Sequence, residues 1–164
     1  MADLEVSFTR VSPTHHRFAY RRPDGSGEAI EMETASLLFH DLLHFAVETE
    51  VGLRGSFYGL LAKVGGYEEL RVAGGAALGG EIAITERVVG ALTGALNADG
   101  GDGDLDADGF VAQVSEFLEY YDEGAPRWMT PALVLQVRER MRQLLGRWKA
   151  TPFGETMTLA FPLP

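Results

Sequence analysis

Strand-like alternation at both ends of the chain is the feature that most constrains its fold. Near the start, Leu4, Val6 and Phe8 alternate with polar residues, and near the end Met157 and Phe161 belong to a similar run. This period of two is typical of a strand with one buried face. The C-terminal strand must pair with another strand, and the other predicted strands are all N-terminal. We therefore expect the two ends of the chain to meet in one sheet.

Two further strands are predicted around a turn in the N-terminal part. His16, Phe18 and Tyr20 share one face of the first, while Ile30 and Met32 alternate with glutamates in the second. The Pro-Asp-Gly-Ser-Gly sequence at 23–27 between them is a strong turn signal. Together with the first strand, these segments predict an antiparallel meander of three strands.

Helical patterns fill the middle of the chain. Apolar residues recur at helical spacing in four segments, and a shorter helix fits a fifth, the predicted ranges being 37–51, 57–64, 84–97, 110–121 and a helix that starts after Thr130. Thr130 followed by Pro131 is a good helix start, as N-cap and first helical residue. The order of elements predicts an α+β fold in a single domain over residues 1–164, with a flexible acidic loop near 97–109.

Composition excludes several kinds of function. The chain has 164 residues, no cysteine and a formal net charge of −10. The absence of cysteine rules out disulfides, thiolate metal sites and thiol catalysis. The negative charge argues against a nucleic-acid partner, because such binding needs lysine and arginine to neutralise phosphates. No apolar run approaches the ~20 residues of a membrane span, and the N-terminus does not resemble a secretory signal, so a soluble cytoplasmic protein without a membrane partner is expected.

The segment FHDLLHFAVETE, residues 39–50, carries the strongest functional signal. His40 and His44 lie four residues apart, which puts both rings on one side of a helix where they could bind one ion. Asp41 and Glu48 fall in the same arc of about 100°. Asp41 is predicted as a ligand or as an acceptor that orients a histidine, and Glu48 as a third ligand or a catalytic base. Histidine and carboxylate ligands suit Zn²⁺, Fe²⁺ or Mn²⁺.

Other interpretations of this segment remain open. His16 faces the side of the sheet that should meet the helices, so it is a further candidate ligand, although a lone histidine there is more often a core residue. The polar residues could instead form a hydrogen-bonded cluster in the core of a non-catalytic interaction or structural module. They could also face water. Against the last interpretation, Leu43 and Val47 lie beside the polar arc and would then be exposed.

Two resemblances are carried by the same region. Residues 40–62, HDLLHFAVETEVGLRGSFYGLLA, resemble small, mostly uncharacterised bacterial proteins with an HDLxHFxVE helix, and this similarity implies a fold of the kind predicted. His40-Asp41-x-x-His44 also resembles the HDxxH zinc motif of the ubiquinone-biosynthesis Coq-type family. That family has a glutamate farther along the chain, where this sequence has Ser56, so Glu48 or Glu50 would have to take its place.

An acidic segment gives a third functional hypothesis. Asp104, Asp106 and Asp108 occupy positions 1, 3 and 5 of a sequence that resembles the start of an EF-hand calcium loop. The twelfth position, normally a bidentate glutamate, is Ser115, so calcium binding would be weak. The glycine-rich segment before the helix at 84–97 lacks a preceding strand and a G-K-[ST] sequence, so it is interpreted as a connection and not as a phosphate loop.

Overall fold

The predicted α+β architecture is confirmed by a computed structural model, which describes residues 3–63, 65–72, 80–100, 103–121 and 124–164. Four strands form one antiparallel sheet, and their bounds are β1 Asp3–Arg10, β2 His15–Arg21, β3 Gly27–Glu33 and β4 Thr156–Pro162. The strand order is β3-β2-β1-β4, so the first and last strands are neighbours. Val6 of β1 lies opposite Tyr20 on one side and Leu159 on the other, as the alternation requires.

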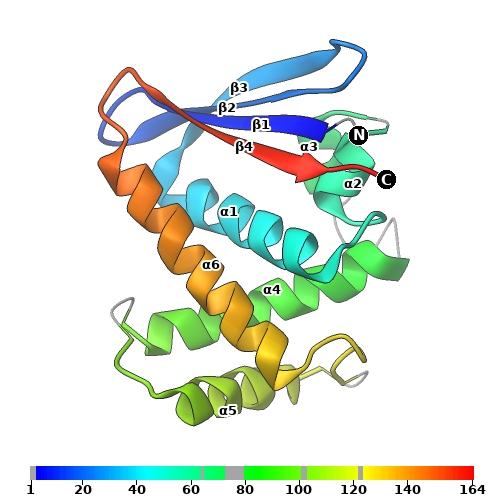
Figure 1. Cartoon of the computed structure of the whole chain (residues 1–164), viewed down its shortest axis with the longest axis vertical. Coiled ribbons are helices and arrows are strands. Elements are labelled where there is room, and N and C mark those ends of the chain that lie inside the picture. The colour runs from blue at the N-terminus through cyan, green and yellow to red at the C-terminus, as the bar shows by residue number, and fades with distance from the viewer. Residues whose placement is uncertain (1–2, 64, 73–79, 101–102, 122–123) are drawn as a thin grey trace.

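Six helices lie on one side of this sheet among the described residues. Their bounds are α1 Thr34–Val51, α2 Phe57–Leu61, α3 Tyr67–Val72, α4 Gly80–Ala98, α5 Ala107–Leu118 and α6 Pro131–Ala150. Figure 1 shows α1 directly beneath the sheet, α4 on the other side of α1, α5 farthest from the sheet, and α6 running diagonally past α1 from α5 to the edge of the sheet. None of the described helices combines the length and the apolar character that a membrane crossing requires.

Helix α1 is enclosed by protein along most of its length. Every residue from Asp41 to Glu48 is buried, including the three polar ones. A helix between a sheet and other helices has no solvated face, so it does not show a simple amphipathic stripe. Burial of Asp41, His44 and Glu48 rules out the interpretation in which these side chains simply face water.

Local sequence explains where several elements begin and end. The Thr130 hydroxyl accepts a hydrogen bond from the Leu133 N–H, and Pro131 follows it, so α6 starts where the sequence indicated. Gly52 ends α1 in the left-handed conformation, with φ 81°, a geometry that glycine adopts without strain. Gly94 lets α5 approach α4 closely, because a Cβ at that position would lie 2.8 Å from the Phe117 ring.

The structure differs from the sequence-based prediction at α3. No helix was predicted over Tyr67–Val72, because six residues flanked by glycines are too few to show helical periodicity. Most of the glycine-rich connection that follows, residues 73–79, lies outside the described residues.

Candidate metal centre

Helix α1 presents two histidine rings on successive turns. The ring centroids of His40 and His44 lie 4.7 Å apart, as their spacing of four residues predicts. His44 is buried, whereas 42% of the His40 side chain is exposed. The pair therefore extends from the core to the protein surface.

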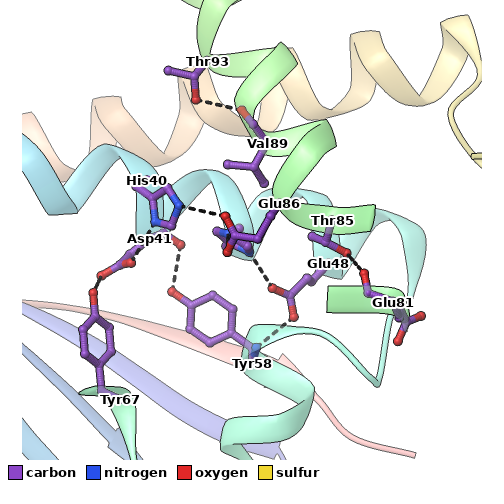
Figure 2. A network of polar contacts seen from close by, with 11 residues as sticks. His40, Asp41, Glu48, Tyr58, Tyr67, Glu81, Thr85, Glu86, Val89 and Thr93 are labelled. Carbon is purple, nitrogen blue, oxygen red and sulfur yellow. Dashed lines mark hydrogen bonds and ion pairs between the residues drawn. The ribbon is translucent and has the colours of Figure 1, made fainter. Parts of the chain in front are cut away.

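Helix α4 adds a third side chain, Glu86, which points toward His40 in Figure 2 and also contacts His44. Its Oε1 lies 3.0 Å from His44 Nε2, and its Oε2 lies 3.5 Å from His40 Nε2. One ligand atom from each of the three residues lies within 4.8 Å of the others. We call this set, His40, His44 and Glu86, the His/Glu group. Such a group could hold a metal ion.

Glu86 was missed by the sequence analysis, although a signal for it exists. Ile82 and Val89 are buried positions of α4, and Glu86 lies four residues after the first and three before the second. It therefore sits on the inward face of the helix. An acidic residue on such a face needs a partner, which α1 supplies here.

The contact between His44 and Glu86 has the spacing of two ligands on one ion. Although the atoms are 3.0 Å apart, His44 Nε2 makes no aligned hydrogen bond in the described structure. Two donors at about 2.1 Å from a tetrahedral ion lie about 3.4 Å apart and point at the ion instead of each other. The donor types and this spacing are compatible with a bound metal ion.

The other nitrogen of each ring faces a carboxylate of the same helix. His44 Nδ1 lies 3.1 Å from Glu48 Oε2, and His40 Nδ1 lies 3.5 Å from Asp41 Oδ1. A carboxylate in this position fixes the histidine tautomer, which leaves Nε2 available to an ion. Of the two roles predicted for Asp41, its placement matches that of the orienting acceptor.

Asp41 and Glu48 are themselves held by two tyrosines. The Tyr67 hydroxyl donates to Asp41 Oδ2 at 2.8 Å, and the Tyr58 backbone N–H donates to Glu48 Oε1 at 2.8 Å. The Tyr58 hydroxyl donates to the Asp41 carbonyl at 2.8 Å (Figure 2). These bonds keep both carboxylates on the Nδ1 side of the rings. Neither carboxylate belongs to the group of converging ligand atoms, and the role of the buried Glu48 as a catalytic base stays a prediction.

Electrostatic coupling within the site favours a charged His44 when no ion is bound. Burial alone lowers the pKa of His44, but contacts with Glu48 and Glu86 outweigh it and raise this pKa to about 9. Burial likewise acts to raise the pKa of Glu86, yet the two imidazoles hold it well below its usual range. Burial raises the pKa of Glu48, which favours its uncharged form. Glu48 is therefore a weaker charge partner of His44 than Glu86 is. Glu86 is the part-exposed member, and we take it as the principal counter-charge.

A pocket of about 380 Å³ opens beside the His/Glu group. Its wall combines two members of the group with polar, cationic and apolar side chains, namely Ser36, Leu37, His40, Asp41, Phe57, Tyr67, Arg71 and Glu86. His44 lies behind this wall, with its ring 5.8 Å from that of Phe57. A small molecule could therefore reach the exposed side of the group.

His16 lies elsewhere in the core. Its Nδ1 is 3.1 Å from the Thr34 hydroxyl, and its ring packs 6.0 Å from both Phe8 and Trp148. Burial lowers the pKa of His16, which therefore favours the neutral ring. The residue does not belong to the His/Glu group, and its surroundings match those of a core histidine.

The acidic segment does not form the calcium loop that its spacing suggested. Asp106 is the N-cap of α5 and accepts a hydrogen bond from the Gly109 N–H at 2.7 Å, which places Asp108 in the first helical turn. An EF-hand loop instead needs twelve residues wrapped around the ion. Within the described ranges, Asp104, Asp106 and Asp108 do not bring their carboxylates together as a ligand group.

The described part of the predicted flexible loop is anchored at Asp99. Arg138 donates to Asp99 Oδ1 at 2.7 Å and to the Leu105 carbonyl at 2.6 Å, which ties this connection to α6. Residues 101–102 of the loop lie outside the described residues, and its flexibility stays a prediction.

Comparison of the chain with protein-family models, with curated proteins and with solved structures finds no significant match. The two resemblances stated from the sequence therefore stay predictions, and the function has to be inferred from the site.

Proposed function

We propose that this protein binds one divalent transition metal ion, Zn²⁺, Fe²⁺ or Mn²⁺, through His40 Nε2, His44 Nε2 and a Glu86 carboxylate oxygen. The observation that carries the proposal is the convergence of these atoms within 4.8 Å from two separate helices. The outer carboxylates Asp41 and Glu48 support it, because metal-binding histidines usually donate their second N–H to such a group.

The pocket favours a catalytic role for the ion over a structural one. Structural sites usually surround the ion with four protein ligands, whereas catalytic sites use three and leave a position open. Here the His/Glu group supplies three, and two of its members line a solvent-facing pocket. A divalent ion at such a site supplies an acidified water or polarises a substrate oxygen. The chain's own residues would orient the ligands and receive the substrate, and we therefore propose a metal-dependent hydrolase or lyase that acts on small molecules.

The cluster also has a non-catalytic interpretation. A charged His44 between Glu48 and Glu86 would satisfy the buried polar groups without any ion, and the raised pKa of His44 favours that state. In that case the group would serve only the stability of an interaction or structural module. The two functions differ in whether an ion is retained.

The test is elemental analysis of protein purified without a histidine tag. We expect close to one zinc, iron or manganese per chain in the wild type, and none in the His40→Ala/His44→Ala double variant or in Glu86→Gln. His15→Ala is the matched control, because His15 is an exposed histidine outside the group and should leave the metal content unchanged. Circular dichroism establishes that each variant is folded. Wild-type protein that is empty, and stays empty after incubation with all three metals, would overturn the proposal.

A further inference from the structure

Arg71 is the only cationic side chain that lines the pocket beside the His/Glu group in the described part of the chain. It lies in the last turn of α3 and lines the same pocket as Glu86 of α4 and His40 of α1. A protein with a net charge of −10 has few surfaces that attract anions. An arginine beside a metal group is therefore informative about the ligand.

Arg71 is held in place while part of its guanidinium remains available. Its Nε and Nη2 donate to Glu68 at 3.3 Å and 2.9 Å, and its Nη1 has no protein partner among the described residues. The pair is exposed, with 45% of the Arg71 side chain accessible, so it contributes little to stability. Guanidinium groups bind carboxylates and phosphates with paired hydrogen bonds, which gives Arg71 a recognition role that lysine would fill poorly.

The remaining wall limits what can bind. Leu37 and Phe57 are apolar, Ser36 offers a hydroxyl, and about 380 Å³ accommodates on the order of ten non-hydrogen atoms. Without an ion, the carboxylates of Asp41 and Glu86 are paired with His40 and His44, so the inner end of the pocket offers an anion no unpaired positive charge. Anion binding should consequently require the metal as well as Arg71.

We infer that the pocket binds a small oxyanion, a compact molecule with a carboxylate or phosphate group, which Arg71 holds while the metal group receives an oxygen of the same molecule. This inference rests on the proposed metal site and names its substrate class. Arg71 thereby acts as a residue that determines specificity.

The test is calorimetric titration of the metal-loaded protein with inorganic phosphate and, separately, with acetate, which distinguishes the two sources of oxyanion. We expect saturable binding of at least one of them, weakened at least 10-fold by Arg71→Ala and less by Arg71→Lys. Glu68→Gln should strengthen binding several-fold, because it removes the competing carboxylate. Metal content should be unchanged in all three variants.

The matched controls are taken from a second exposed arginine–glutamate ion pair, on α6. Arg142 contacts Glu139 at 3.0 Å with the same spacing of three residues, so Arg142→Ala and Glu139→Gln remove an equivalent charge away from the metal pocket. They should leave anion affinity unchanged. Metal-loaded protein that binds neither anion, or binds with equal affinity after Arg71→Ala, would overturn this inference and leave the metal proposal intact. Absence of metal would overturn the proposed function itself.

Discussion

Each histidine of the His/Glu group lies between two carboxylates, one on its own helix and one on α4. For His44 these are Glu48 at 3.1 Å and Glu86 at 3.0 Å. The ring can balance these charges by binding a proton at Nε2 or by directing that nitrogen at an ion. Proton and metal therefore compete for the same atom.

This competition gives the metal-free protein a characteristic pH dependence. The pKa of His44 is raised to about 9 in the folded state, above its unfolded value of 6.5, so the charged ring stabilises the fold below pH 6.5 and this contribution is lost as pH rises toward 9. The free energy of unfolding should fall by up to about 3 kcal/mol across that window. Denaturant titrations of chelator-treated protein between pH 6 and pH 9 would measure it. A flat profile would show that folding does not raise the pKa of His44.

The outer carboxylates lead to a second prediction for single residues. Asp41→Asn and Glu48→Gln keep the shape of the side chains but weaken the acceptors that orient the two rings, so metal affinity should fall roughly 10- to 100-fold without being abolished. Competition with a chelating dye would measure the change. Glu50→Gln is the control, since Glu50 lies on the same helix but contacts Arg140 at 2.7 Å instead. Unchanged affinity in both test variants would contradict the role given to these carboxylates.

Sequence reasoning identified half of this arrangement. The spacing of His40 and His44 within one helix is local information, and so is their proximity to Asp41 and Glu48. Whether Asp41 and Glu48 face the Nδ1 or the Nε2 side of the histidine rings depends on their other hydrogen-bond donors. These donors are the Tyr67 hydroxyl for Asp41 and the Tyr58 N–H for Glu48. Glu86 could not be assigned to the site because the contact between α1 and α4 is tertiary and leaves no trace in spacing.

At the scale of elements, the short helix α3 depends on contacts with the rest of the molecule. Tyr67, its first residue, is 1% exposed, packs its ring 4.9 Å from Phe18 of the sheet and donates its hydroxyl to Asp41 of α1. Helices this short are unstable by themselves. One side chain therefore joins α3, which carries Arg71, to the sheet and to α1.

Removal of the Tyr67 hydroxyl should weaken this connection. Tyr67→Phe keeps the ring but leaves Asp41 Oδ2 without its donor, and we expect a loss of roughly 1–3 kcal/mol in the free energy of unfolding. Tyr120→Phe is the control, because Tyr120 is 76% exposed and should change stability very little. Thermal and denaturant unfolding would compare the two. Equal stability of both variants would mean that the Tyr67–Asp41 bond contributes nothing.

The positions of most helices and strands could be predicted because their signals are local, although α1, α4 and α5 begin three or four residues earlier than predicted. Alternation marked all four strands, and Thr130 with Pro131 marked the start of α6. The acidic segment was interpreted as a calcium loop because its local pattern fits two structures. Aspartates at alternate positions suit a calcium loop and also suit an N-cap, and Asp106 adopts the latter role.

At the scale of the whole molecule, β4 closes the core. The Phe161 side chain is completely buried, with its ring 5.7 Å from that of Tyr58 and 6.1 Å from that of Phe45. Tyr58 in turn donates bonds to Asp41 and Glu48. The C-terminal strand thus packs against the residues that support the His/Glu group.

Truncation of this side chain should be costly. Phe161→Ala removes a ring from a fully packed region, and we expect a loss of about 3–5 kcal/mol in the free energy of unfolding. Phe153→Ala is the matched control, since Phe153 is 57% exposed and lies against the Arg10 guanidinium; its loss should cost less than about 1 kcal/mol. Chemical denaturation measures both. A small effect at Phe161 would contradict the burial of β4.

The pairing of β1 with β4 also has a consequence for the order of folding. β1 can pair with β2 as soon as both have left the ribosome. Its other edge pairs with β4, which is synthesised last. Pairings between such distant segments form slowly, because a long loop must be closed first. Until β4 arrives, β1 has an unpaired edge and a partly open core beneath it, which is the state most prone to association with other chains. Completion of the sheet, and with it of the support beneath the metal centre, would then be a late step in folding.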